Sequence, residues 1–426
     1  RLSDARTPTA HAASHEVGGS DELSLAQSQV TGLVSDLAGK LANPSSVDAD
    51  IHGVTVGRGA GSLDTNTAVG NGALSSSTTG SFNTAVGRDA LSSNTTGSAN
   101  TATGRNALLD NTTGDSNTAT GINALRDNTT GSENTATGRD ALVRNTTGSG
   151  NTATGMEALE RNTTGSNNTA MGHEALLENT TGNDSTATGA FALDSNTTGS
   201  GNTATGRSAL QGNTTGSSNT ATGRSALSDN TTGVRNTATG RDALVNNTTG
   251  SDNTATGRSA LQSNTTGSNN TALGYRAGSS NTTGSNNTML GYDAEASSAT
   301  VSNTVTLGNS SITTLRCQVT SITSLSDRRD KTNIQPIGAG LSFVEQLEPV
   351  KFDWNMRDGG KVDVPDMGFV AQDLLQVMED TGIDVPHLVS QDNPDKLEAA
   401  YGTLIPILVQ AIKELSAEVK TLKERN

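Results

Sequence analysis

The feature that most constrains this chain is an internal repeat of 17 residues. The block at residues 66–70, Asn-Thr-Ala-Val-Gly, recurs at a constant step up to residues 287–291, which gives fourteen copies without an insertion. A second block, Ala-Leu-x-x-Asn-Thr-Thr-Gly, lies between successive copies, and Ser185 alone replaces the leading Asn of the first block. So constant a step predicts one coil of a stacked structure for each repeat.

The length of the repeat favours strands over helices. Seventeen residues are too few for a helical hairpin repeat, which needs about 33. Two Thr-rich segments, each followed by a Gly that permits a tight corner, predict two strands of about four or five residues in every coil. Equivalent residues of successive coils would then stack about 4.8 Å apart as parallel strands. We therefore expect a mainly β fold, with an elongated β-solenoid shaft over residues 53–308.

Apolar residues recur too sparsely for a thick core. The Ala of the first block and the Leu of the second are the reliably apolar positions of each coil, so we expect a single Ala–Leu ladder. The fourth position of the first block varies between Thr and the apolar residues Val69, Val86, Met171, Leu273 and Leu290. This variation favours a half-buried contact with another chain, because coils with a thin core bury surface mainly against neighbours.

Composition excludes several classes of protein. The net charge of -15 argues against a nucleic-acid-binding surface and against a polyanionic partner. The one cysteine, Cys317, excludes an internal disulfide network, and we expect no cofactor. No apolar run approaches the roughly 20 residues that span a bilayer, so we expect no membrane insertion. The chain begins at Arg1 without a signal peptide or an initiator Met, which indicates a fragment of a longer protein.

The N-terminal region is predicted to hold a linker and a neck. Residues 1–20 contain His11 and His15, which could meet around a threefold axis, but solvated imidazoles are favoured and we expect no metal. Leu23 begins a heptad pattern that ends at Leu41, before an Asn-Pro pair. A short trimeric coiled-coil neck is therefore expected within residues 21–52.

The composition changes near residue 310. The last 101 residues hold five of the nine aromatic side chains, which predicts a separate α/β domain over residues 326–426. Its last apolar residues follow heptad steps and predict a trimeric coiled coil, with a lone amphipathic helix as the alternative: Tyr401, Ile405, Leu408, Ile412, Leu415, Val419 and Leu422. Residues 309–325 predict a β-rich connector.

The repeats resemble the β-rolls of trimeric autotransporter adhesin heads and, more closely, the repeats of phage tail fibres. This resemblance covers about residues 53–308 and implies a homotrimer. Threonine pairs and Asn-Thr-Thr triplets also permit ice binding or glycosylation as interpretations. A rigid shaft is favoured over both, because the domain that follows has no place in an ice-binding protein and the triplets arise from the repeat. The aromatic residues before residue 326 are too few and too scattered to predict a sugar-stacking platform.

The head of the last domain carries the motif Ser326-Asp-Arg-Arg-Asp-Lys331. Together with the segments at 347–354, 368–372 and 401–407, it resembles the intramolecular chaperone domain of phage endosialidases and tail fibres, a family of self-cleaving serine peptidases. The resemblance implies that Ser326 is the nucleophile, Lys331 its base, and Leu325–Ser326 the scissile bond. Asp327 and Arg329 match the other fixed positions of the family motif.

The chemistry of such a pair depends on the lysine. A serine hydroxyl needs a neighbouring base, and a lysine serves when desolvation or a cationic neighbour lowers its pKa. Arg328 and Arg329 could supply the positive field, whereas Asp327 and Asp330 would oppose it. The sequence leaves both outcomes open.

Together with the repeat pattern, these two resemblances imply a homotrimeric phage tail fibre or spike that attaches to host cells. Its chaperone would align the three chains and then cut itself off, as a single-turnover peptidase without an external substrate. Expected partners are two identical chains, an upstream tail or baseplate protein, and a host surface receptor, expected to be a glycan. The expected location is the virion tail, after assembly in the host cytoplasm. The alternatives are a bacterial trimeric surface adhesin, an uncleaved structural fibre, and a polysaccharide-degrading enzyme with a carboxylate pair.

Overall fold

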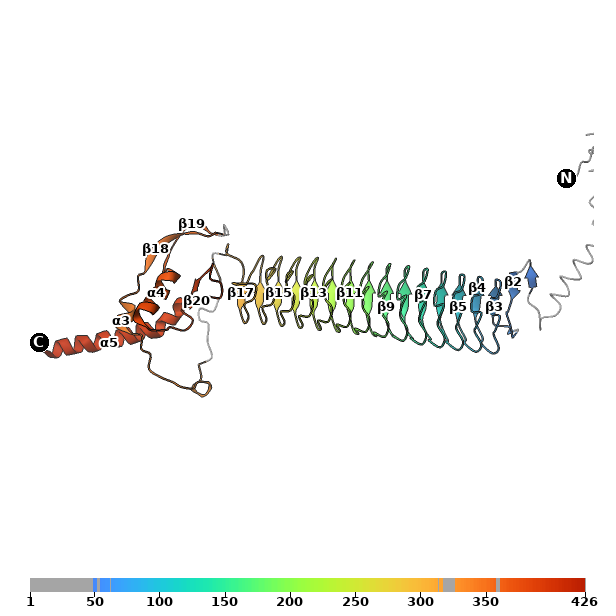
Figure 1. Ribbon diagram of the computed structural model, residues 1–426, viewed down its shortest axis with the longest axis horizontal. Helices are drawn as coiled ribbons and strands as arrows, with labels where there is room; N and C mark the ends of the chain where they lie inside the picture. Colours follow the sequence, from blue (N-terminus) through green and yellow to red (C-terminus); the bar gives the residue numbers. More distant parts are fainter. Residues whose placement is uncertain are drawn as a thin grey trace, which may run out of the picture. The chain divides into compact units, whose positions relative to one another are not determined.

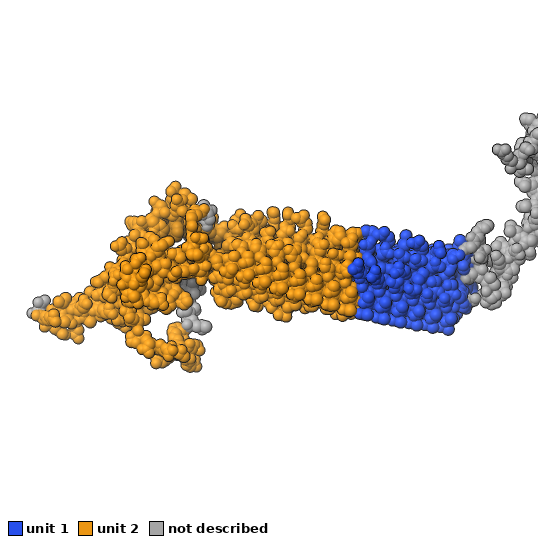
Figure 2. Space-filling view, in the orientation of Figure 1, with its two compact units in different colours: residues 1–164 blue, residues 165–426 orange. Residues whose placement is uncertain are grey.

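The computed structural model describes residues 49–51, 54–61, 63–312, 314–316, 326–357 and 361–425. The histidines His11 and His15, the predicted heptads of the neck, Cys317 and Leu325 lie outside the described residues. The chain divides into two compact units, residues 1–164 and residues 165–426 (Figure 2). Each unit is described by itself.

The coils of the N-terminal unit begin at β3. Consecutive strands pair in parallel, and each residue lies beside its equivalent 17 positions later, as Thr101 does beside Thr118. These strands are β3 (Thr67–Val69), β4 (Thr84–Val86), β5 (Thr101–Thr103), β6 (Thr118–Thr120), β7 (Thr135–Thr137) and β8 (Thr152–Thr154). Before them, β1 (Ala49–Ile51) and β2 (Val54–Gly57) run antiparallel, and β2 is also antiparallel to β3.

The C-terminal unit contains the same kind of stack. Its nine parallel strands lie side by side in Figure 1. They are β9 (Thr169–Met171), β10 (Thr186–Thr188), β11 (Thr203–Thr205), β12 (Thr220–Thr222), β13 (Thr237–Thr239), β14 (Thr254–Thr256), β15 (Thr271–Leu273), β16 (Thr288–Leu290) and β17 (Val305–Leu307). The predicted mainly β solenoid of 17-residue repeats is confirmed.

Each coil has one strand, so the prediction of two strands was wrong. The Ala-Leu block forms turns instead, and its Leu is left-handed in every coil, with φ between 49° and 54° from Leu74 to Leu261. This block still bonds to the next coil, since Leu91 N donates to Ala107 O at 3.0 Å. The coil therefore closes by left-handed corners where the sequence pattern predicted a second strand.

The core contains more than the predicted ladder. In the strands, Thr side chains point outward and Ala side chains inward, as Ala102 does at 0% exposed. The Ala that precedes each Leu is also buried, as Ala107 and Leu108 show. Each coil thus contributes two alanines and one leucine. Burial of the leucine alone is worth about 1.5–3 kcal/mol.

Two buried asparagine ladders complete the interior of the coils. Asn100, in the first block, donates from Nδ2 to Gly114 O at 2.8 Å and accepts from Asn117 N at 2.9 Å. Asn111, in the second block, donates to Asn94 Oδ1 at 2.9 Å. Hydrogen bonding lets these fully buried amides replace apolar volume. Because the Asn of each Asn-Thr-Thr triplet, such as Asn111, is buried, the folded shaft does not present it for glycosylation.

The glycine that ends each strand permits close approach between coils. Gly206 has a φ of +131°, and a Cβ at this position would lie 2.7 Å from the carbonyl oxygen of Gly223. An L side chain would therefore be strained and would overlap the next coil.

One pair of positions exchanges a large and a small side chain. Gly278 stands where earlier coils have Leu, and Met289 stands where they have Ala. A Cβ at Gly278 would overlap Met289 Cε and lie 3.0 Å from Leu261 Cδ2. Met289 is fully buried and fills the volume that the leucine occupies elsewhere.

The remainder of the C-terminal unit is a small α/β domain. Its elements are η1 (Arg328–Asp330), α3 (Leu341–Val344), β18 (Val350–Asn355), β19 (Val362–Gly368), α4 (Ala371–Thr381), β20 (Val389–Ser390), β21 (Glu398–Ala399), η2 (Tyr401–Thr403) and α5 (Leu404–Arg425). The strand pairs β18–β19 and β20–β21 are antiparallel. Helix α4 ends at Gly382, whose φ of 65° fits a left-handed C-cap.

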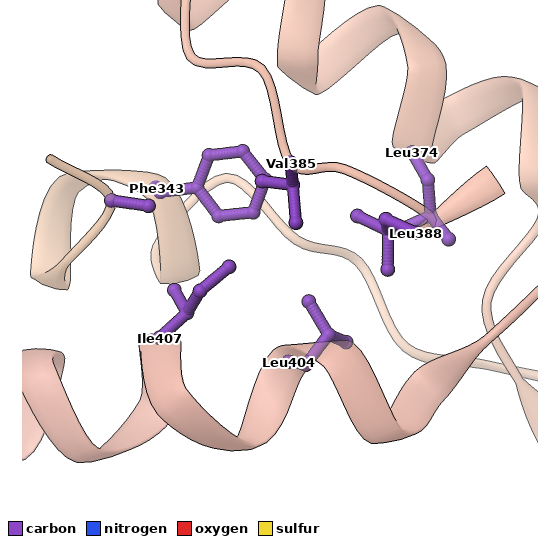
Figure 3. Packing of buried hydrophobic residues seen from close by; sticks show 7 residues of the cluster. Phe343, Leu374, Val385, Leu388, Leu404 and Ile407 are labelled. Atoms are coloured by element: carbon purple, nitrogen blue, oxygen red, sulfur yellow. The ribbon is translucent and has the colours of Figure 1, made fainter. Parts of the chain in front are cut away.

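One apolar cluster holds this domain together. Phe343 from α3, Leu374 from α4 and Leu404 from α5 point toward one another (Figure 3). Val385 and Leu388, from the segment after α4, close the cluster, and Phe343 is fully buried. Helix α3 therefore packs against α5, and α4 joins the same cluster through Leu374.

The structure describes only part of the predicted connector, which stays a prediction. Residues 309–312 and 314–316 contain no strand, although a β-rich segment was expected over 309–325, and residues 317–325 lie outside the described residues. Of the helices that the structure describes, none combines the length and apolarity that a membrane span requires.

Candidate functional site: the Ser326–Lys331 turn and helix α5

A single turn brings the two predicted catalytic residues together. In η1, Asp330 N donates to Asp327 O and Lys331 N to Arg328 O, each at 3.2 Å. The chain reverses over this turn, and Lys331 Nζ donates to Ser326 Oγ at 2.6 Å. The five-residue spacing therefore places the amine and the hydroxyl within hydrogen-bonding distance, as a nucleophile and its base require.

Asp327 and Arg329 hold this turn. Asp327 is the N-cap of η1, and its carboxylate accepts from Arg329 N at 2.9 Å. The same carboxylate accepts from Arg329 Nη2 at 2.5 Å. These bonds from the guanidinium and the backbone of Arg329 lower the pKa of Asp327. Asp327 and Arg329, whose charges were expected to act on Lys331 in opposite directions, thus pair with each other.

The pair is open to solvent in the single chain. Residues 326–338 are all exposed. A serine–lysine pair is active when its amine is neutral, and desolvation is one way to reach that state. The contacts within one chain thus place Lys331 Nζ beside Ser326 Oγ, and the Lys331 side chain stays exposed to solvent.

Two of the family-like segments meet beside the core. The Tyr401 hydroxyl donates to Phe369 O and accepts from Phe369 N, both at 3.1 Å. The two rings also make an edge contact, with centroids 5.6 Å apart. In the segment at 347–354, Trp354 Nε1 donates to Asp366 Oδ2 at 3.0 Å across the β18–β19 pair. These segments therefore build the domain that carries the turn.

Helix α5 has two apolar faces. Leu404, Ile407 and Ala411 pack inward and are at most 5% exposed. Of the predicted heptad residues, Tyr401 lies in η2 and packs on Phe369, and the six on α5, from Ile405 to Leu422, are between 42% and 66% exposed. In Figure 1, α5 extends beyond α3 and α4. The heptad face is therefore not the face that packs on the domain.

A glutamate of α5 fixes the start of α3. Leu341 N donates to Glu414 Oε2 at 2.6 Å, and Gln410 Nε2 donates to Glu414 Oε1 at 2.8 Å. These bonds lower the pKa of Glu414, with the backbone bond as the larger cause. A Cβ at Gly340 would overlap this carboxylate. This contact was not predictable from the sequence patterns, since neither Leu341 nor Glu414 belongs to a recognised motif.

Metal sites and cavities are the other candidates for a functional site. Among the residues that the structure describes, no group of three or more His, Cys, Asp or Glu side chains could hold a metal ion. A cavity of about 940 Å³ lies in the domain, lined by Trp354, Phe369 and Tyr401 among others, and neither Ser326 nor Lys331 lines it.

The C-terminal domain matches a known protein family. Residues 326–383 match the family described as chaperone of endosialidase. The long tail fiber proteins of Enterobacteria phages K3 and T2 are each 35% identical to the chain over 104 residues, 24% of its length. This match covers 8% of the K3 protein and 7% of the T2 protein, so the chain spans a small part of either relative's length. No solved structure matches the chain.

The family match confirms the resemblance drawn from the sequence motifs. It includes the Ser326–Lys331 turn, β18, β19 and α4. The relatives are tail fibre proteins, which is consistent with a place in the virion tail. The chain is thus similar to the chaperone-of-endosialidase family over residues 326–383 and to tail fibre proteins over 104 residues.

Proposed function

We propose that three copies of this chain form a host-attachment fibre whose C-terminal domain aligns the chains and then cleaves itself off. The observation that supports assembly into trimers is that α5 has two apolar faces. One face completes the domain core, while six heptad residues, from Ile405 to Leu422, remain exposed on another. A heptad seam of this length is covered when identical helices pack together.

Alignment matters because the coils are nearly identical. A slip of one coil between chains presents nearly the same exposed strand threonines, because these repeat in each coil, so the shaft alone discriminates weakly between registers. Long-range parallel pairing is also slow and exposed to aggregation. A C-terminal domain that trimerises first excludes the slipped registers, and the coils then assemble from a fixed end.

The proposed cleavage uses the turn at the head of the domain. Ser326 Oγ attacks the Leu325 carbonyl carbon while Lys331 takes the hydroxyl proton. The C–N bond breaks, the Ser326 amine receives a proton, and the acyl group moves to the hydroxyl as an ester. Water then hydrolyses the ester, which leaves a carboxylate on residue 325 and frees residues 326–426. Contact with neighbouring chains would desolvate the exposed Lys331 amine, so cleavage would follow assembly.

Mass spectrometry of the denatured full chain tests the cleavage. We expect a fragment of residues 326–426, and we expect its loss in Ser326→Ala while trimers remain. Lys331→Arg keeps the charge but cannot act as a base, so cleavage should slow by about 10²–10⁴-fold. The matched control, Lys351→Arg, makes the same exchange at an exposed lysine of β18 outside the pair. An intact wild-type chain in stable trimers would instead indicate an uncleaved structural fibre.

Sedimentation velocity tests the assembly. Ile412→Lys places a charge in the exposed heptad face and should convert trimers into smaller species. Ser416→Lys adds the same charge on the exposed surface of α5 outside that seam and should leave trimers intact. A wild-type chain that sediments as a folded monomer would contradict the proposal.

Attachment is the remaining part of the proposed function. Residues 1–20 would join an upstream tail or baseplate protein, and the shaft would meet a glycan receptor on the host. Fluorescently labelled full-length fibre should bind host bacteria and not unrelated bacteria. The tail fibre relatives favour this role over a bacterial surface adhesin.

A further inference from the structure

The sixth position of the repeat forms an unusual column in the C-terminal unit. Six successive coils carry large side chains there, and all are exposed: Arg207, Arg224, Arg241, Arg258, Tyr275 and Tyr292. We call this set the Arg–Tyr column. Backbone bonds align its members, since Ser225 N donates to Arg207 O at 3.0 Å and Arg276 N to Arg258 O at 2.9 Å. At about 4.8 Å for each coil, the column is about 24 Å long.

Most arginines of the column have no acidic partner among the described residues. In the N-terminal unit, the same repeat position gives Arg88 an ion pair with Asp89 at 3.1 Å, and Arg139 one with Glu157 at 2.7 Å. In the column, Arg241 contacts Asp242 at 2.9 Å. Serines follow the other three arginines, at Ser208, Ser225 and Ser259.

Three of the four arginines therefore carry positive charges that no described acidic side chain pairs with. Like charges on neighbouring strands repel each other, which favours an acidic ligand along the column. Because the chain as a whole has a net charge of -15, this local positive charge is not visible in the overall composition. A guanidinium binds carboxylate or phosphate groups with two parallel hydrogen bonds. The column therefore fits a ligand that carries acidic groups at intervals along its length.

The column ends in a stacked aromatic pair. The rings of Tyr275 and Tyr292 lie 5.4 Å apart between centroids and within 13° of parallel. The Arg258 guanidinium lies 5.7 Å from the Tyr275 centroid, a cation–π distance that links the two parts of the column. Tyr292 is 65% exposed, and Leu273, in the strand that precedes Tyr275, is 53% exposed. Exposed aromatic and apolar surface of this kind marks an interaction site.

We propose that the Arg–Tyr column binds an acidic polysaccharide of the host surface, with its chain along the column. Carboxylate groups of the sugar pair with the arginines, and a sugar ring stacks on Tyr292. This inference rests on the proposed attachment function and specifies the receptor class. A contact among three copies of the column is disfavoured, because it would bring the arginines of all three chains together.

Binding of the full-length fibre to polygalacturonate tests the site, with neutral dextran as the uncharged polymer. Arg207→Gln/Arg224→Gln/Arg258→Gln should weaken polygalacturonate binding by about tenfold or more, since charge-assisted hydrogen bonds are lost. The matched control is Arg88→Gln/Arg105→Gln/Arg139→Gln, which makes the same charge change at the same repeat position in the other unit. It should alter the affinity by less than about twofold, because the changed arginines lie outside the column.

The tyrosine is tested separately. Tyr292→Ala should weaken polygalacturonate binding, and Tyr292→Phe should retain most of it, because stacking needs the ring. An equal loss of polygalacturonate binding in the triple arginine variant of the column and in its matched control would overturn the proposal. So would binding of single-stranded DNA that matches polygalacturonate binding and is insensitive to Tyr292→Ala, since that pattern is non-specific polyanion binding. Loss of trimers in the column variant alone would show an interface between copies and would also overturn it.

Adsorption to host cells separates this inference from the attachment function. If wild-type fibre binds cells and the column variant binds them equally, the site is wrong and the attachment function stands. If wild-type fibre binds polygalacturonate through the column and binds no cells, the site stands and the attachment function is wrong.

Discussion

Replacing Asn219 with Ala tests whether the buried asparagine ladder stabilises the coils. The Asn219 side chain donates to Gly233 O at 2.8 Å and accepts from Asn236 N at 2.9 Å, and it is fully buried. The replacement leaves the Asn236 N–H without its acceptor in an interior that excludes water. An orphaned buried donor costs about 1–3 kcal/mol, and the lost amide leaves a small cavity. We expect local stability to fall by about 2–3 kcal/mol.

Hydrogen–deuterium exchange measures this loss coil by coil, which suits a repeat structure. A loss of 2 kcal/mol corresponds to about 30-fold faster exchange, expected in peptides that span residues 219–236. Asn219→Ser should lose less, because Ser185 already stands in one coil and its hydroxyl accepts from Asn202 N at 3.3 Å. The exposed residue Asn246 provides the control, Asn246→Ala. If Asn219→Ala exchanges no faster than this control, the ladder is not a source of stability.

Three further changes test other parts of the structure. Gly206→Ala should lower the thermal midpoint of the shaft, because it places a Cβ 2.7 Å from Gly223 O. Gly201→Asn should not, because at this left-handed position a Cβ would meet Ser218 at ordinary contact distances of 3.8 Å or more. Met289→Ala should cost about 2–4 kcal/mol in urea unfolding, and adding Gly278→Leu should recover much of it, because the pair then matches the other coils. The lowered pKa of Glu414 means that its stabilisation is present above the unfolded pKa of about 4.3 and is lost as the pH falls through the folded value. Glu414→Gln should therefore reduce the acid sensitivity of the C-terminal domain, followed by circular dichroism between about pH 5 and 3.

The repeat period was sufficient to predict the solenoid, because a constant 17-residue step requires equivalent positions to stack. It did not predict the shape of each coil. Leucine is rarely left-handed, so the φ of 51° at Leu91 contradicts local preference and is imposed by contacts with neighbouring coils. The buried asparagines were missed for a similar reason: Asn usually indicates a turn, and its role as a core residue depends on partners in the next coil.

The contact between Ser326 and Lys331 was predictable from a resemblance and not from spacing alone. The turn that joins them depends on the pairing of Asp327 with Arg329, whose effect the sequence left open. Tyr275 and Tyr292 were dismissed as scattered, although their separation is the repeat length. Reading the sequence down each repeat position would have revealed both the stacked rings and the four arginines before them.

The asparagine ladder also has an evolutionary consequence. Nearly every coil offers the next one the same amides and carbonyls, so a deletion or duplication of 17 residues between such coils rejoins matching surfaces and keeps the asparagine bonds. A change of any other size shifts Asn out of line with its acceptor. Recombination between the similar coding repeats can therefore add or remove whole coils of the solenoid without any compensating mutation.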